Sequence, residues 1–164
     1  MKTLMVAAAT AALALAAPAL AQAQSVYGNL GYASVDVDPV SLGAVQGRLG
    51  VRVNDNFAVE GEAAFGVAGD DIAGVDVDLD NEFGAFLVVL APVGENTDIF
   101  ARAGFASAEV DAGPLGSTSD DGGAYGVGIQ HFFGENDGFR FDYTHYEFGG
   151  DADSWAIAWV HRFN

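Results

Sequence analysis

Charged side chains recur at alternate positions of apolar segments, a spacing that suits the pairing of opposite charges. Glu60 and Glu62 follow Arg48 and Arg52 after a short polar break. Residues two apart on a strand point to the same side, so arginines and carboxylates on neighbouring strands can meet directly. The residues predicted to form ion pairs are Arg48, Arg52, Glu60, Glu62, Glu82, Arg102, Arg140, Asp142 and Arg162.

A second acidic group suggests calcium. The stretch GVDVDLDNE (74–82) would place Asp76, Asp78, Asp80 and Glu82 on one side of an extended strand. Carboxylate oxygens are the ligands that Ca²⁺ prefers, so Asp76, Asp78 and Asp80 form a candidate site. The stretch lacks the glycine and the distal glutamate of an EF-hand loop. The sequence therefore favours the alternative interpretation, a solvated and repulsive acidic rim.

A third group could do acid–base chemistry. His145 and Glu147 share one face of a segment, and Ser107 takes a similar outward position elsewhere. A catalytic set of this type would need three strands to cooperate. The chain has no cysteine, no phosphate-binding glycine loop and no nucleophile elbow. We therefore expect no enzyme and no cofactor other than the calcium considered above, and lipid modification is the least favoured alternative.

The N-terminus has the pattern of an export signal. Lys2 precedes an Ala- and Leu-rich run, and Pro18 and small residues then offer a cleavage site. The apolar run is short and has no stop-transfer flank, which disfavours a membrane anchor. We predict a signal peptide over residues 1–23 and a single domain over residues 24–164.

The elements that must position the charged groups read as strands. Eight segments alternate with a period of two, and no useful helical period appears. Tight connections near residues 54–55, 92–96 and 134–137 alternate with longer ones over 36–43, 68–75, 111–120 and 148–154. This layout is typical of an eight-stranded antiparallel up-and-down transmembrane β-barrel. The predicted strands are 26–35, 43–53, 56–67, 75–91, 98–110, 121–133, 138–148 and 153–163.

The distribution of side chains indicates which face of the predicted sheet is polar and which contacts lipid. Every arginine falls on the face opposite the aromatic residues: Arg162, for example, opposes Trp155 and Trp159. The charged face also carries many Gly and Ala residues, which suit a narrow interior, and the bulky face suits lipid. A soluble barrel or β-sandwich would need a polar outer surface, yet the only lysine is Lys2. The membrane barrel is therefore favoured.

The interior charges allow two interpretations. The ion pairs could satisfy one another and fill the barrel, or they could exchange partners and open a small pore. An eight-stranded barrel has room for little beyond its own side chains, so the sequence favours the structural interpretation.

A family resemblance rests on specific motifs. Residues 124–163 carry G-x-G-x-Q-x-F-F-G, then an R-x-D-Y stretch and a final strand that ends on an aromatic residue, while 57–66 and 91–106 match the middle of the pattern. The chain resembles the porin-like outer-membrane β-barrel domain family, small eight-stranded barrels similar to the membrane domain of outer-membrane protein A. The resemblance implies that the barrel-assembly machinery reads Trp155, Ile157, Trp159 and Phe163. Asn164, after the aromatic residue, departs from the family pattern.

The expected function follows from charge and resemblance. The formal net charge of −17 makes nucleic acid an unsuitable partner. We expect an integral protein of the bacterial outer membrane whose partners are lipid, the assembly machinery during biogenesis and an unidentified extracellular ligand. The expected role is structural or one of surface interaction through acidic extracellular loops. A narrow porin for small, cationic solutes is the alternative.

Overall fold

The computed structural model describes residues 24–37, 40–72, 75–111 and 117–163. The predicted signal peptide and Asn164 lie outside these residues. The strands are β1 (Ser25–Val37), β2 (Val40–Arg52), β3 (Phe57–Ala68), β4 (Asp70–Ile72), β5 (Val75–Pro92), β6 (Thr97–Asp111), β7 (Ser117–Phe132), β8 (Asp137–Glu147) and β9 (Asp151–Phe163). Among the residues described, no helix has the length and apolar character needed to cross a bilayer.

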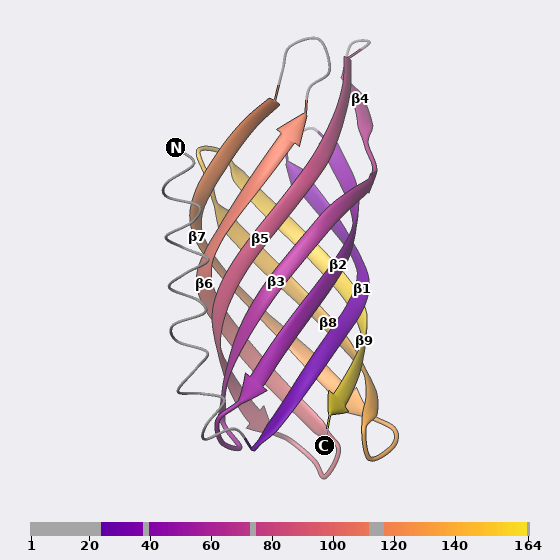
Figure 1. The fold of residues 1–164 in the computed structure, drawn as a ribbon, viewed down its shortest axis with the longest axis vertical. Coiled ribbons are helices and arrows are strands. Elements are labelled where there is room, and N and C mark those ends of the chain that lie inside the picture. Colours follow the sequence, from indigo (N-terminus) through magenta and orange to yellow (C-terminus); the bar gives the residue numbers. More distant parts are fainter. Residues whose placement is uncertain (1–23, 38–39, 73–74, 112–116, 164) are drawn as a thin grey trace.

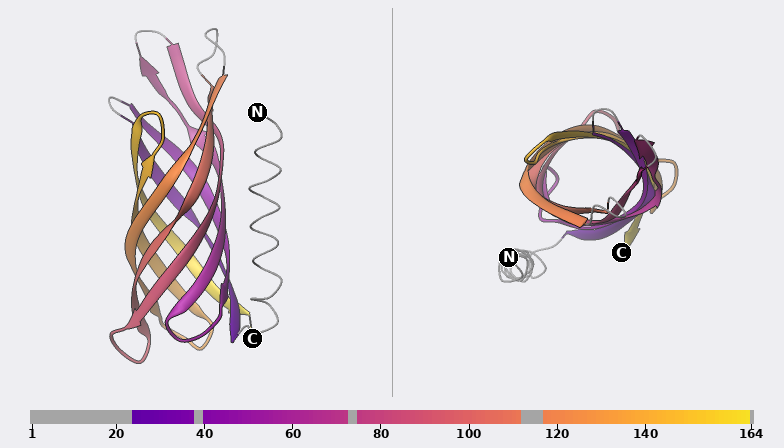
Figure 2. Two further views of the ribbon diagram at one scale, coloured as in Figure 1. Left: turned by 90° about the vertical axis from the view of Figure 1, so that its left-hand side faces the viewer. Right: turned by 90° about the horizontal axis from the view of Figure 1, so that it is seen from above.

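Eight of these strands form a closed antiparallel barrel. Each strand pairs with its neighbour along the chain, β3 pairs with β5, and β1 pairs with β9 to close the ring. Figure 1 shows the strands tilted strongly against the long axis, and the view from above in Figure 2 shows the closed ring. Closure leaves none of the eight barrel strands without a partner, which a bilayer requires because lipid cannot hydrogen-bond to the backbone. The predicted eight-stranded fold is confirmed.

The three tight turns share one geometry. In each, a backbone N–H donates to the carbonyl four residues later: Val53 to Phe57, Val93 to Thr97 and Phe133 to Asp137, at 2.9–3.0 Å. These turns lie at one end of the barrel, together with the C-terminal end of β9 (Figure 1). The opposite end carries the remaining connections and is the extracellular end in the topology of outer-membrane barrels. The predicted contrast in length is wrong for most of these connections, because only residues 112–116 separate two neighbouring strands by more residues than a tight turn does.

Strand pairing runs further at the extracellular end than the sequence predicts. The predicted loop 36–43 is mostly strand, since Val37 still pairs with Val40. The predicted loop 68–75 contains β4, which pairs with the start of β5, and β7 begins at Ser117 inside the predicted loop 111–120. Gly, Asp and Pro residues in these stretches predicted turns. The backbone hydrogen bonding that begins in the barrel nevertheless continues through Gly and Asp residues, because their low strand propensity is outweighed by the pairing already formed.

The two faces of the barrel differ as the alternation predicts, with one exception. The inner face also holds buried aromatic residues, so the prediction that every arginine lies opposite the aromatics is wrong; these residues are Tyr27, Phe86, Phe100, Phe132 and Tyr146. Leu30, Leu49 and Phe105 on the outer face are 65–76% exposed, whereas the inner face buries arginines and carboxylates. Near the short turns Phe133, Phe139 and Trp159 pack with ring centroids 5.2–5.3 Å apart. Farther along the outer face, Tyr143 packs on Trp155 at 4.8 Å. Aromatic clusters of this kind suit the two boundaries between membrane and water.

Candidate functional site: a charge cluster inside the barrel

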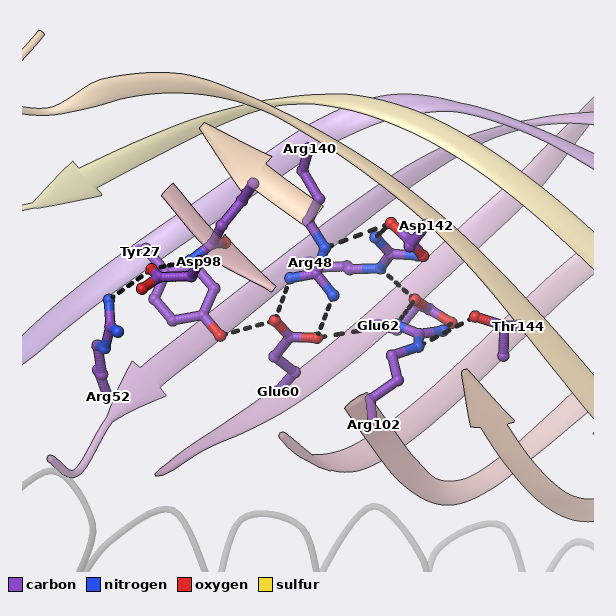
Figure 3. Close-up of polar contacts among 11 residues, drawn as sticks. Tyr27, Arg48, Arg52, Glu60, Glu62, Asp98, Arg102, Arg140, Asp142 and Thr144 are labelled. Atoms are coloured by element: carbon purple, nitrogen blue, oxygen red, sulfur yellow. Dashed lines mark hydrogen bonds and ion pairs between the residues drawn. The ribbon is translucent and has the colours of Figure 1, made fainter. Parts of the chain in front are cut away.

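Six of the predicted residues meet at one level of the lumen. Alternation along the strands points each of them inward, although they come from four strands spread over the whole sheet (Figure 3). The central cluster consists of Arg48 from β2, Glu60 and Glu62 from β3, Arg102 from β6, and Arg140 and Asp142 from β8. Three guanidinium groups therefore face three carboxylates, and the formal charges balance.

Each arginine of the central cluster bridges acidic residues. Arg48 donates to the two oxygens of Asp142, both at 2.8 Å, and its Nε donates to Glu62. Arg102 binds Glu62 through two parallel hydrogen bonds of 2.7 and 3.0 Å. These paired contacts are the geometry in which guanidinium and carboxylate groups bind most strongly. The cluster is therefore a connected network rather than a set of separate pairs.

Arg140 completes the network. Its two terminal nitrogens donate to Glu60, one of them at 3.1 Å, and its Nε lies 3.3 Å from Asp142. The guanidinium carbon lies 3.9 Å from the ring centroid of Phe100. Arg102 stacks in the same way on Phe86, at 3.9 Å. Each of these two cations therefore has carboxylates at its edge and an aromatic ring on its face, an arrangement that compensates its loss of water.

Sequence reasoning missed the hydroxyl groups that complete the cluster. Tyr27 donates to Glu60 at 2.6 Å, Tyr146 donates to Glu62 at 3.3 Å, and Arg102 Nε donates to Thr144 at 3.1 Å. All three residues lie on the inward face together with the arginines. Their positions in the alternating pattern of each strand could therefore have predicted them. Gly50 makes room for the Tyr27 ring, because a Cβ there would lie 2.2 Å from it.

The cluster is closed to water. Its six side chains are only 0–1% exposed. Toward the short turns lies an apolar layer that includes Val88, Phe100, Phe132 and Val160. Toward the extracellular end lies a second layer made largely of alanines with Leu42, Leu79 and Phe86. The central part of the lumen is thus a charged layer between two apolar layers.

The remaining predicted arginines form a separate group near the short turns. Arg52 lies 3.2 Å from Asp98, and Arg162 lies 3.9 Å from the same carboxylate. Gln130 also donates to Asp98 at 2.9 Å, and Arg162 stacks on Phe132 at 3.4 Å. Sequence reasoning missed Asp98, which is the first residue of the predicted strand 98–110, although it shares the parity of Arg102.

Glu82 lies in the lumen without the ion pair that the sequence predicts. Its side chain is 3% exposed, and its Oε1 has no hydrogen-bond partner in the described part of the chain. None of the ion pairs among the described residues includes it. The three arginines at this level are already engaged by Glu60, Glu62 and Asp142.

The acidic stretch at the start of β5 does not keep one face. A β-bulge at Asp80 inserts one residue between Leu79, which pairs with Val110, and Asn81, which pairs with Glu109. Leu79 and Glu82 consequently both point inward, while Asp78 and Asp80 are exposed. The prediction that Glu82 shares a face with the aspartates is wrong for this reason.

The calcium site stays a prediction. The side chain of Asp76 lies outside the described residues. Within the described part of the chain, no group of three or more His, Cys, Asp or Glu side chains is arranged to hold a metal ion.

The outer parts of β5, β6 and β7 form an acidic wall at the extracellular end. Its acidic residues are Asp78 and Asp80 on β5, Glu109 and Asp111 on β6, and Asp121 on β7. Asp78 pairs directly with Asp111, and Asp121 lies beside Ser107 on the neighbouring strand. The long strands extend above the rest of the barrel on one side (Figure 1). Carboxylates gathered in this way give this side of the extracellular end a negative potential.

The predicted assembly residues line the lipid-facing side of β9. Trp155, Ile157, Trp159 and Phe163 are 45–58% exposed. Asp137 accepts hydrogen bonds from the indole of Trp159 at 3.2 Å and from Nδ1 of His161 at 2.6 Å. The first residue of β8 therefore fixes the aromatic end of β9.

His145 does not form the candidate catalytic set with Ser107. Its Nδ1 lies 2.8 Å from Asp153, which also accepts from Tyr143, and its ring packs on Tyr125. Ser107 lies on β6, with β7 between it and β8, and pairs with Asp121. In the described part of the chain, Ser107 and His145 therefore do not meet.

A closed eight-stranded barrel with an apolar outer face defines the class of outer-membrane β-barrels. The family described as outer membrane protein beta-barrel domain matches residues 7–163, and the chain belongs to this family. Its location is the bacterial outer membrane. A comparison with curated protein sequences found no significant match.

Solved structures share the fold at low sequence identity. The Ail protein of Yersinia pestis, in complex with the heparin analogue sucrose octasulfate, is 18% identical with a TM-score of 0.64, and the alignment covers 85% of this chain and 98% of Ail. The N-terminal β-barrel domain of Pseudomonas aeruginosa OprF is 14% identical with a TM-score of 0.67, covering 87% and 100%. OprG from the same organism is 13% identical with a TM-score of 0.67, covering 87% and 97%.

Proposed function

We propose that the protein is a non-conducting outer-membrane barrel that contributes to the structure of the envelope and makes contacts through its acidic extracellular surface. The observation that carries the proposal is the closed charge cluster. A path for water and ions would expose the side chains that line it, whereas the six clustered side chains are at most 1% exposed. The apolar layers on both sides add a further barrier to ions.

The acidic wall supports the second half of the proposal. Asp78 and Asp111 lie opposite each other on β5 and β6, and Asp80 and Asp121 are exposed on the same wall. Carboxylates gathered in this way repel one another and attract cations. A cationic partner, such as a basic segment of another protein, would relieve the repulsion. The Ail structure holds a sulfated, anionic ligand, and the charge of this wall disfavours such a ligand here.

Single-channel recording tests the closed lumen. Refolded protein lacking residues 1–23 is inserted into planar bilayers, and folding is confirmed by the mobility shift between boiled and unboiled gel samples. We expect a folded and silent barrel. Steady cation-selective openings would reject the proposal and favour the narrow porin for small solutes.

Binding of a basic polypeptide tests the surface role. Protein in lipid nanodiscs is titrated with polylysine at low and high salt. The variant Asp78→Asn/Asp80→Asn/Glu109→Gln is expected to bind more weakly, because it neutralises three acids of the wall. The matched control Asp55→Asn/Glu95→Gln/Glu135→Gln removes equal charge from the short turns. Equal losses in the two variants would show that net charge alone governs binding.

A further inference from the structure

Glu82 is a buried carboxyl group that the charge cluster does not use. In the β3–β5 register, Glu62 faces Gly84 and Ala64 faces Glu82. The two glutamates are therefore diagonal neighbours on the inner face, and Gly84 places no side chain between them. The Glu82 side chain accordingly lies beside Glu62, which also accepts a hydrogen bond from the Tyr146 hydroxyl at 3.3 Å.

The charge balance leaves Glu82 without a counter-ion. Arg48, Arg102 and Arg140 balance Glu60, Glu62 and Asp142, so an ionised Glu82 would add one uncompensated charge to a closed interior. An unpaired buried charge is among the most unfavourable features that a folded protein can contain. The interior avoids such a charge only if another cation pairs with Glu82 or if Glu82 is neutral.

The neighbours of Glu82 favour the neutral form. Its charged and titratable neighbours are Glu62 from β3, Arg102 from β6 and Tyr146 from β8. Arg102, the cation among them, already donates two hydrogen bonds to Glu62. Two ionised carboxylates in contact repel each other, whereas a protonated carboxyl can donate a hydrogen bond to its partner.

We propose that Glu82 is a proton-binding site of the lumen, occupied at neutral pH, and that the proton holds the central cluster closed. Loss of this proton to water places a second carboxylate beside Glu62. The two carboxylates then compete for Arg102, and the paired hydrogen bonds between Arg102 and Glu62 loosen. Alkaline pH consequently destabilises the charged layer.

Infrared spectroscopy of the folded protein in lipid vesicles tests the protonation directly. At neutral pH we expect the carbonyl stretching band of a protonated carboxyl group in the wild type and its loss in Glu82→Gln. Absence of this band in the wild type, or an unchanged band in Glu82→Gln, would overturn the proposal. Glutamine mimics the shape of the neutral acid, so failure of Glu82→Gln to fold would overturn it as well.

Unfolding at a series of pH values tests the consequence. The folded protein binds this proton more tightly than the unfolded chain does. Its contribution to stability is therefore complete only below the ordinary glutamate pKa of about 4.3 and is lost progressively as pH rises from there until the folded protein also releases the proton. The midpoint of urea unfolding should fall as pH rises through this range in the wild type and fall less in Glu82→Gln. Glu62→Gln is the matched control, because it removes a carboxylate that arginines need and should destabilise at neutral pH. If the unfolding midpoint instead changes with the Na⁺ concentration at constant pH, a metal cation rather than a proton neutralises Glu82, and the proposal is rejected.

Discussion

Replacement of Glu60 by alanine removes the carboxylate that holds Arg140. In the wild type, Arg140 makes two hydrogen bonds to Glu60 and one longer contact to Asp142. Tyr27 also loses its acceptor in the variant. The guanidinium group of Arg140 stays 1% exposed in the native arrangement, so water cannot replace the lost partner without opening the lumen.

The expected cost follows from this geometry. Removing one partner of a buried ion pair costs about 3–5 kcal/mol, because the other charge is left uncompensated. We expect Glu60→Ala to lower the free energy of unfolding by about this amount. If water enters the lumen and solvates Arg140 instead, the variant should show a higher leak conductance. Urea unfolding in lipid vesicles, followed by the fluorescence of Trp155 and Trp159, measures the first effect, and planar bilayers measure the second.

A charge-balanced variant is the control for this prediction. Glu60→Leu/Arg140→Met removes one cation and one anion together and leaves Arg48 and Arg102 to balance Glu62 and Asp142. Replacing a buried pair by apolar residues is often neutral, so the double variant should recover much of the lost stability. If Glu60→Ala changes neither stability nor leak, or if the double variant is worse than the single one, the network does not hold the lumen in the way described.

Three further predictions concern the outer surface. Leu49→Arg places a charge on the lipid face and should cost about 2–4 kcal/mol in the same unfolding assay if this position lies near the bilayer midplane; Gln46→Leu, on the buried inner face, is the contrasting variant. Phe163→Ala should slow folding in the presence of the barrel-assembly machinery but not spontaneous folding into detergent, and equal effects in the two assays would argue against an assembly signal. Because the bulge turns Glu82 away from Asp78 and Asp80, we expect no heat on calorimetric titration with millimolar Ca²⁺; heat that disappears in Asp78→Asn/Asp80→Asn would establish the calcium site.

The alternation of side chains made the barrel predictable. A period of two assigns each residue to a face without knowledge of its partners, and the charged residues keep to one face from segment to segment. The inward position of Arg48 or Arg140 and the outward position of Trp159 therefore follow from local sequence. The extents of the extracellular strands do not, because their pairing continues a ladder that begins in the barrel.

Partner choice depended on the closed structure. Parity places Arg48 and Asp142 inside, but only the tilt and register of the closed sheet bring side chains 94 positions apart to the same level. The same register makes Arg52 and Arg162 share Asp98. The bulge at Asp80 changed the face of Glu82 relative to the aspartates before it, since one inserted residue reverses the alternation. The sequence by itself determined that the chain forms strands with two different faces, and it indicated the family. The tertiary structure decided how far the extracellular strands extend and which charges meet, and it left Glu82 without a counter-ion among the described residues, because these depend on the register and closure of the sheet.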